Sequence, residues 1–215
     1  MDIDLFLKVY PYLLEGAIVT IQLSVATIFL SLICGSLGAY AKLSSQKYLR
    51  TIGNVYVSVI RGTPALLQLF ILYFGGPQIG IQLTAFEAGI IGLGLNTGAY
   101  MTETIRGAII SISRGQTEAA RTLGLSINQT MIKVILPQAV RLMIRPLGVN
   151  INALIKDTAL VSTISVVELT YIAQRFAAST YEPVQVFVLA GCTYMILILF
   201  VGTLIKYLDK KVQIN

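Results

Sequence analysis

The chain has 215 residues, of which 55% are hydrophobic and only 12% are charged. A soluble domain carries about 25% charged residues, so this composition and the mean hydropathy of +0.77 exclude a water-soluble fold, a disordered chain and a coiled coil. Histidine is absent and there are two cysteines, Cys34 and Cys192, so we expect no metal site and no catalytic residues. The net charge of +6 is better explained by basic loops at a membrane than by nucleic-acid binding.

Five stretches are long enough to cross a bilayer, where a helix needs ~20 mostly apolar residues. We place them at residues 13–41, 53–75, 84–106, 130–156 and 183–207. The third and fourth are the most polar, and the fourth contains two prolines. The leader before the first span is acidic, unlike a secretory signal, so we expect this span to be retained. The sequence therefore predicts an all-α integral membrane protein with five transmembrane helices.

Basic loops determine the orientation of these spans. Lys and Arg gather after the first span, between the third and fourth, and in the C-terminal tail, whereas the alternate loops carry few. We therefore place the N-terminus outside and the C-terminus inside. Residues 158–182 are too polar to span. We expect a helix over 164–176, capped by Ser162 or Thr163, lying on the outer side across the mouth of the bundle.

The cytoplasmic loop between the third and fourth spans has the capping pattern of a short helix. Ser113 and Gln116 have capping-box spacing, and Gly124 can end the helix in the left-handed conformation. Ser126 and Gln129 repeat the capping box at the start of the next helix. An ordinary amphipathic connector would show the same pattern, so capping by itself leaves the role of this helix open.

The residues inside this loop resemble the EAA signature of ABC importer permeases. The matching residues are Glu118-Ala119-Ala120, Gly124 and Val134-Ile135-Leu136-Pro137, with Val134 where the family pattern has Ile. Three further stretches are similar to the polar amino-acid branch of that family. They are Arg61-Gly62-Thr63-Pro64, Asn96-Thr97-Gly98-Ala99-Tyr100 with Glu103 and Arg106, and Lys156-Asp157-Thr158 with Leu160-Val161-Ser162. The resemblance covers nearly the whole chain.

This resemblance implies one transmembrane permease domain over residues 1–215 that imports polar amino acids, with basic ones as a narrower option. It implies a coupling helix at about 114–125 that docks in a cytoplasmic ABC ATPase through Glu118, Ala119, Ala120, Leu123 and Gly124. The chain has no G-x-x-x-x-G-K-[ST] loop, so we expect no cofactor on it and place ATP and Mg on the ATPase subunits.

Further partners follow from the same resemblance. A second permease copy is implied, with a homodimer favoured over a homologous second permease. An extracytoplasmic substrate-binding protein would deliver the amino acid. The location implied is a prokaryotic cytoplasmic membrane.

Charged residues inside the spans are candidates for the substrate pathway, because a charge at the bilayer centre costs at least ~2.5 kcal/mol. Arg61 precedes Gly62-Thr63-Pro64, which can break the second span and expose backbone dipoles. The alternative is a packed kink, with Arg61 paired to an acid. Asp157 lies at the outer end of the fourth span, where its carboxylate could meet a substrate ammonium. The alternative is a helix cap or a local ion pair with Lys156.

Asn96, Tyr100 and Glu103 are spaced by four and three residues and therefore share one face of the third span. The ring of Tyr100 can enclose a ligand, and the amide of Asn96 offers both a donor and an acceptor. This face either lines the pathway or forms a buried hydrogen-bond network, in which Glu103 pairs with Arg106 or Arg61.

Glu15 opens the first span on the outer side. If Glu15, Glu103 and Asp157 converge, the cavity is acidic and favours cationic amino acids. The competing function is an ion-gradient-driven carrier or channel in which Glu103 and Asp157 bind protons or sodium. A membrane enzyme is a third class, but we find no nucleophile and base pattern to support it.

Overall fold

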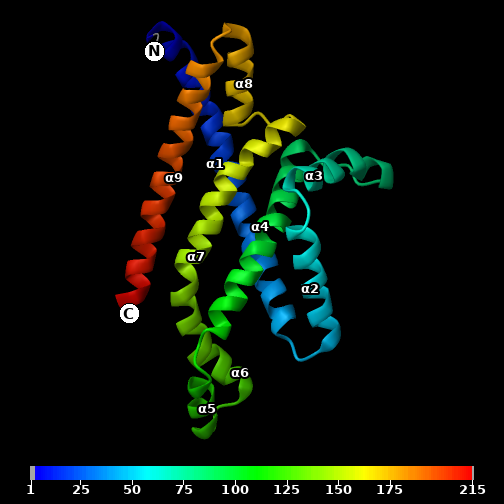
Figure 1. The fold of residues 1–215 in the computed structure, drawn as a ribbon, viewed down its shortest axis with the longest axis vertical. Coiled ribbons are helices and arrows are strands. Elements are labelled where there is room, and N and C mark those ends of the chain that lie inside the picture. The colour runs from blue at the N-terminus through cyan, green and yellow to red at the C-terminus, as the bar shows by residue number, and fades with distance from the viewer. Residues whose placement is uncertain (1–2, 215) are drawn as a thin grey trace.

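The computed structural model describes residues 3–214, and helices account for most of them. The elements are α1 (Ile3–Leu43), α2 (Lys47–Arg61), α3 (Ala65–Phe70), η1 (Ile71–Gly75), η2 (Gly76–Ile79), α4 (Ala85–Ile110), α5 (Arg114–Thr122), α6 (Ile127–Thr130), η3 (Met131–Ile135), α7 (Leu136–Asp157), η4 (Thr158–Ile164), α8 (Leu169–Thr180) and α9 (Pro183–Ile214). Residues 3–214 contain no strand, which confirms the predicted all-α class. Figure 1 shows an elongated bundle of α1, α4, α7 and α9, with α5 and α6 at the end away from the N-terminus.

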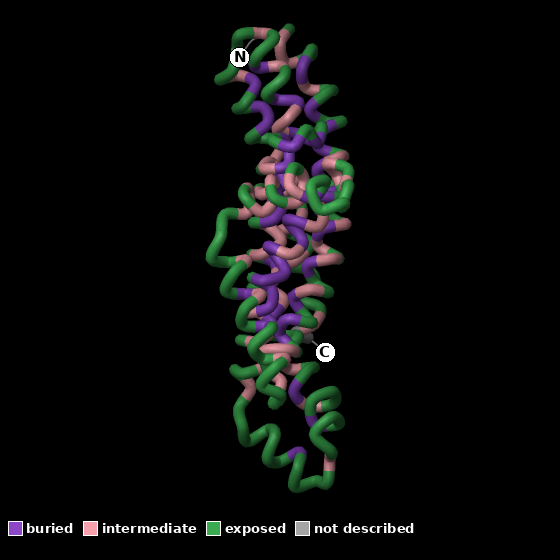
Figure 2. The backbone as a smooth tube through the Cα atoms, turned by 90° about the vertical axis from the view of Figure 1, so that its right-hand side faces the viewer, coloured by how far each residue is buried: buried purple, intermediate pink, exposed green. Residues whose placement is uncertain are grey.

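Helices α1 and α4 pack closely along the middle of the bundle because glycines on each helix lie at the contact. A Cβ added to Gly35 of α1 would lie 2.8 Å from the Cβ of Met101, and one added to Gly98 of α4 would lie 2.7 Å from the Cβ of Cys34. The Ser31 hydroxyl donates to the Gly94 carbonyl oxygen at 3.2 Å. Such small-residue contacts are the usual means by which helices associate in lipid. The buried residues in Figure 2 accordingly run along the bundle axis.

The predicted second span, residues 53–75, is bent rather than straight. Helix α2 ends at Arg61, and the helical run from Ala65 to Ile79 leaves it at an angle of 102°. This run passes through the π-helical η1 and the 3₁₀-helical η2 before Gly80 ends it at a φ of 81°. In Figure 1 it projects sideways from the bundle near the N-terminal end of α4. The pair is therefore a broken span or a re-entrant segment.

Three helical runs are long and apolar enough to cross a membrane: α1, Ile127–Ile164 and Pro183–Val212. The bent pair makes a fourth if it counts as one span. The predicted third span, in α4, is not among them, because this helix carries polar residues and several glycines along its length. Helix α4 contacts α1, α2 and α7, so its composition reflects protein neighbours more than lipid.

The prediction for residues 158–182 is wrong in two respects. The chain first makes the 3₁₀ helix η4, then turns at Ser165 with a φ of 69°, and α8 begins only at Leu169. Neither Ser162 nor Thr163 caps α8, because the cap is the side chain of Glu168. Helix α8 also packs along α1 and α9 rather than across the mouth of the bundle (Figure 1).

Glu168 is fully buried and joins three helices. Its carboxylate accepts hydrogen bonds from the backbone N–H groups of Thr170 and Tyr171 at 2.9 and 2.8 Å. It also accepts from the hydroxyl of Tyr194 in α9 at 2.7 Å and from that of Thr20 in α1 at 3.5 Å. These bonds compensate for burying the carboxylate, so Glu168 holds the start of α8 against α1 and α9.

We predict that Glu168→Ala lowers the free energy of unfolding by about 3 kcal/mol, because it removes a helix cap and charge-assisted hydrogen bonds to two other helices. Thermal unfolding of the purified membrane complex measures this loss. Glu182→Ala is the matched control, since Glu182 is an exposed carboxylate at the start of α9. Equal melting temperatures for the two variants would contradict a stabilising role for Glu168.

Candidate functional site

A polar cavity of about 380 Å³ lies where the helix break meets α4 and α7. The break contributes Thr63, Pro64 and Ala65, α4 contributes Asn96, Thr97 and Tyr100, and α7 contributes Asn150, Ala153 and Asp157. Three of the predicted pathway residues, Asn96, Tyr100 and Asp157, therefore line one cavity, although Asp157 lies far from the other two in the sequence. The lining offers amide, hydroxyl and carboxylate groups, which is the mixture that a small polar molecule needs.

The break is held open by the side chain of Gln68. Its Nε2 donates to the carbonyl oxygen of Ile60 at 2.8 Å, and to the carbonyl oxygen and hydroxyl of Thr63 at 3.2 and 2.8 Å. Its Oε1 accepts from Asn96 Nδ2 at 3.1 Å. Pro64 has no N–H to continue the helix, so carbonyl groups are freed at this point and Gln68 satisfies them. Asn96 thus orients Gln68 as well as lining the cavity.

Arg61 does not line the cavity but contacts the residue that closes one side of it. Its guanidinium carbon lies 4.8 Å from the centre of the Tyr100 ring, within range of a cation–π interaction. The predicted alternative paired Arg61 with an acid, yet no ion pair found among the described residues includes Arg61. Tyr100 is 42% exposed. It both contacts Arg61 and lines the cavity.

Asp157 is half-buried at the end of α7 and faces the cavity together with Asn150. Lys156, its sequence neighbour, lines a different hollow beside Gly191 and Tyr194, so the helix turns these two charges to different sides. Asn150 Nδ2 donates to the Thr104 hydroxyl at 3.0 Å, which ties α7 to α4 below the cavity.

The other two predicted acids lie elsewhere. Glu103 pairs with Lys42 of α1 and with Arg106, whose Nη2 lies 2.9 Å from Glu103 Oε2. Glu15 lines a separate hollow with Arg175 of α8. Within the described chain, Glu15, Glu103 and Asp157 therefore do not converge, and the condition for an acidic cavity is not met.

Sequence reasoning missed Gln68 and Asn150 and did not single out Thr63 as a cavity residue. A signal for Asn150 exists, because it lies seven residues before Asp157 and hence on the same face of one helix. Gln68 follows Pro64 by four residues, which places its amide one turn after the break. Neither spacing reveals the hydrogen bond between Gln68 and Asn96, since it joins two different helices.

The predicted cytoplasmic helix is present as α5, between Arg114 and Thr122. Gly124 ends it with a φ of 83°, and the N–H groups of Gly124 and Leu125 donate to the carbonyl oxygens of Arg121 and Ala120 at 3.0 and 3.2 Å. This pattern is a Schellman motif, as the glycine predicts.

The two predicted capping boxes differ in outcome. Ser126 and Gln129 form one at the start of α6, as predicted. The first box is not formed. Ser113 Oγ accepts from the N–H of Gly115, and Gln116 accepts from Gln138 Nε2 of α7 at 3.4 Å.

Helix α5 exposes most of its residues, and apolar ones are among them. Ala120 is buried, whereas Glu118, Ala119 and Gly124 are exposed. Leu123 is 82% exposed, and Ile127 at the start of α6 is 73% exposed. Exposed large apolar side chains at both ends of the turn between α5 and α6 are compatible with contact to a protein partner.

Comparison with known proteins assigns the family. Residues 12–214 match the family described as the binding-protein-dependent transport system inner membrane component. The chain belongs to this family. The L-cystine transport system permease TcyB of Bacillus subtilis is 38% identical over 202 residues, which cover 94% of this chain and 86% of TcyB. A Rickettsia typhi protein assigned by name to a glutamine transport system, the permease GlnP, is 37% identical over 213 residues, covering 97% and 98% of the two chains.

The fold agrees with this assignment. A crystal structure of an amino acid ABC transporter with histidines aligns with a TM-score of 0.91 at 32% identity, covering 98% of this chain and 99% of that chain. This permease is therefore a multi-pass inner-membrane component of an ABC transporter, as the EAA resemblance predicted. Membership also implies an ATPase and a binding protein as partners.

We predict that Gln68→Leu lowers uptake by the assembled transporter about tenfold, because several polar groups at the break lose their partner and each unsatisfied group costs ~1–3 kcal/mol. Uptake of labelled amino acid into proteoliposomes measures the effect. Gln78→Leu is the control, since Gln78 is an exposed glutamine of the same projecting segment. Unchanged uptake in Gln68→Leu would show that the break does not need this amide.

Proposed function

We propose that this permease forms half of the translocation pathway of an ATP-driven importer for polar amino acids. The observation that carries this proposal is the cavity at the helix break, where Asn96, Tyr100 and Asp157 meet inside a chain of the inner-membrane component family. Relatives named for cystine and glutamine transport support amino acids as the substrate class.

The cavity suits the group that all amino acids share. Asp157 offers a carboxylate to the α-ammonium, while Asn96 and Asn150 offer amide N–H donors to the α-carboxylate. One carboxylate in the cavity matches the ammonium of any amino acid. A preference for basic side chains would require a second acid, and neither Glu15 nor Glu103 reaches this cavity.

The proposed topology has five spans, with the N-terminus outside and the C-terminus inside. Helix α4 counts as a span in this proposal because its neighbours α1, α2 and α7 shield its polar residues from lipid. The bent pair α2 and α3 counts as one broken span, and discontinuous helices are a known way to build substrate sites at membrane depth. The basic residues at the α9 end of the bundle support a cytoplasmic C-terminus.

The pathway would be completed by a second copy of the permease, in a homodimer. Helix α5, with Glu118, Ala119, Ala120, Leu123 and Gly124, would be the coupling helix that docks in the ATPase. ATP and Mg would bind the ATPase, and this chain would be non-catalytic. A substrate-binding protein would deliver the amino acid from outside. Closure of the ATPase would pull α5 and shift the spans between outward-open and inward-open states.

The first experiment is reconstitution of the permease in liposomes with and without its ATPase. We predict amino-acid uptake only when both subunits and ATP are present. Glu118→Lys or Gly124→Pro should abolish uptake while leaving membrane insertion intact, because one reverses an exposed charge and the other removes the left-handed glycine and its N–H. Glu182→Lys is the control for charge reversal. Uptake driven by an ion gradient without the ATPase would instead support the carrier function.

A second test addresses the substrate. We predict that Asp157→Asn lowers uptake of glutamine and arginine alike by about tenfold, because both lose the same charge-assisted hydrogen bond, worth ~1.5–3 kcal/mol. Uptake of the two labelled amino acids by the same proteoliposomes gives the comparison, with Glu182→Gln as control. A selective loss of arginine uptake would overturn the assignment of Asp157 to the α-ammonium and restore the preference for basic amino acids.

A further inference from the structure

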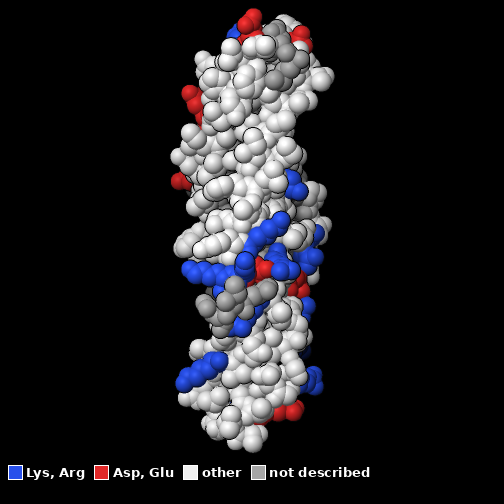
Figure 3. Space-filling view, turned by 90° about the vertical axis from the view of Figure 1, so that its left-hand side faces the viewer, with Lys and Arg blue, Asp and Glu red and all other residues white. Residues whose placement is uncertain are grey.

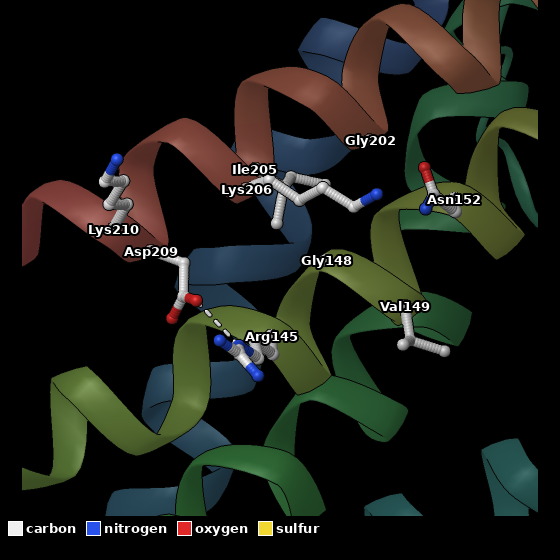
Figure 4. Close-up of a pocket in the computed structure, with 9 residues that line it drawn as sticks. All are labelled: Arg145, Gly148, Val149, Asn152, Gly202, Ile205, Lys206, Asp209 and Lys210. Atoms are coloured by element: carbon white, nitrogen blue, oxygen red, sulfur yellow. Dashed lines mark hydrogen bonds and ion pairs between the residues drawn. The ribbon is translucent and has the colours of Figure 1, made fainter. Parts of the chain in front are cut away.

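A second hollow, separate from the polar cavity, lies between α7 and α9 near the C-terminal end of α9 (Figure 4). Its volume is about 590 Å³. Gly148 and Val149 of α7 and Gly202 and Ile205 of α9 form an apolar part of its wall. A Cβ added to Gly148 would lie 2.6 Å from Ile205 Cγ2, so the two helices touch there, whereas the space around Gly202 is open to at least 4 Å.

Three cationic side chains border this hollow. They are Arg145, Lys206 and Lys210, with Asp209 as the single acid beside them. Arg145 Nε donates to Asp209 Oδ2 at 2.6 Å, and the Arg145 side chain is still 73% exposed. One carboxylate against three cations leaves an excess of positive charge. Figure 3 shows Lys and Arg side chains gathered at and below the middle of this side of the molecule, with a few acidic side chains among them.

The deeper end of the hollow is also polar. Asn152 Oδ1 is buried and has no hydrogen-bond partner in the described structure. In Figure 4 the Lys206 side chain extends along the hollow toward Asn152, away from the pair formed by Arg145 and Asp209. A ligand lying here would meet ammonium and guanidinium donors, one amide acceptor and an aliphatic wall.

We propose that this hollow binds the headgroup of an anionic phospholipid. The phosphate would lie among Arg145, Lys206 and Lys210, and the first methylenes of an acyl chain would lie against Val149 and Ile205. Cationic pockets between transmembrane helices on the cytoplasmic side are suited to anionic headgroups, because the phosphate layer lies at that depth. This placement uses the cytoplasmic orientation of the α9 C-terminus proposed above, but it does not depend on which amino acid is transported.

A lipid bound in this hollow would affect transport, because the hollow and the polar cavity share helix α7. Helix α7 presents Asn150 and Asp157 to the polar cavity on one face and Val149 and Asn152 to the hollow on another. A lipid bridging α7 and α9 would therefore hold the helix that carries part of the substrate cavity. Anionic lipid would bias the position of α7 without contacting the amino acid.

The test is native mass spectrometry of the permease–ATPase complex with phosphatidylglycerol and phosphatidylcholine of identical acyl chains in competition. We expect preferential retention of phosphatidylglycerol. The double variant Lys206→Gln/Lys210→Gln should weaken that retention about 25-fold, since each cation near an anionic headgroup contributes a factor of about five. Lys47→Gln/Lys211→Gln removes the same charge from outside the hollow and should change retention less than twofold.

A steric variant separates a shaped site from a charged surface. Gly202→Leu fills the open part of the hollow while keeping all three cations, and it should displace phosphatidylglycerol. Gly191→Leu is the matched control, because Gly191 lies in the same helix, also has open space around it, and borders a different hollow.

Four results would overturn the proposal. Equal retention of the two lipids would remove the headgroup preference. Equal weakening by both double variants would reduce the effect to general attraction by the basic face. Displacement of the lipid by soluble glycerol phosphate at comparable concentration would identify a free-anion site. A disulfide between two copies carrying Val149→Cys would show that a second permease covers the hollow.

Discussion

The helix break between α2 and α3 is stabilised by a side chain that satisfies the backbone groups that the break frees. Lipid offers no hydrogen bonds, so an unpaired carbonyl there costs several kcal/mol. Gln68 bonds the carbonyl oxygens of Ile60 and Thr63, and Asn96 in turn bonds Gln68. The cavity depends on this arrangement, because Thr63 and Pro64 reach it only through the bend. Loss of the amide would therefore disturb the cavity without changing the residues that contact a ligand.

The bundle has a tightly packed side, where α1 contacts α4 and α8, and a more polar side around the cavity. Glycines bring α1 and α4 together, and Lys42 of α1 pairs with Glu103 of α4 toward their C-terminal ends. Glu168 likewise joins helices through a charged group: its carboxylate bonds the start of α8 and Tyr194 of α9, and it also contacts Thr20 of α1. The cavity lies on the other side of α4, among α3, α7 and the break. Contacts there are fewer and more polar, which would suit the rearrangement proposed for transport.

The end of the bundle that carries α5 is connected to that cavity through α7. Helix α5 buries Ala120, and Leu123 directly after the helix is exposed. Gln116 of α5 accepts a hydrogen bond from Gln138 of α7. Helix α7 runs from this contact to Asp157 at the cavity. Under the proposed function, a displacement of α5 by the ATPase would reach the cavity along this single helix, whose other face carries the proposed lipid site. The proposed coupling, substrate and lipid contacts would then all involve α7.

The sequence by itself determined the helical class, the membrane location, the short helix at α5 and its left-handed end at Gly124. These features depend on composition, on apolar runs and on residue-specific backbone preferences, all of which are local. The motif spacing also identified the family, because a motif is recognised along the chain and does not require knowledge of which residues touch. The prediction of an ABC importer permease came from this resemblance and not from the chemistry of single residues.

Only the tertiary structure decided which polar residues meet. It brought Asp157 to Asn96 and Tyr100 and added Gln68 and Asn150. It placed Glu15 in a separate hollow and paired Glu103 with Lys42 and Arg106. It also placed the cap of α8 at Glu168, although Ser162 and Thr163 were the stronger local signals. The physical reason is the rotation and register of each helix against its neighbours. These follow from packing between segments distant in sequence, such as Gly35 against Met101, which no local pattern contains.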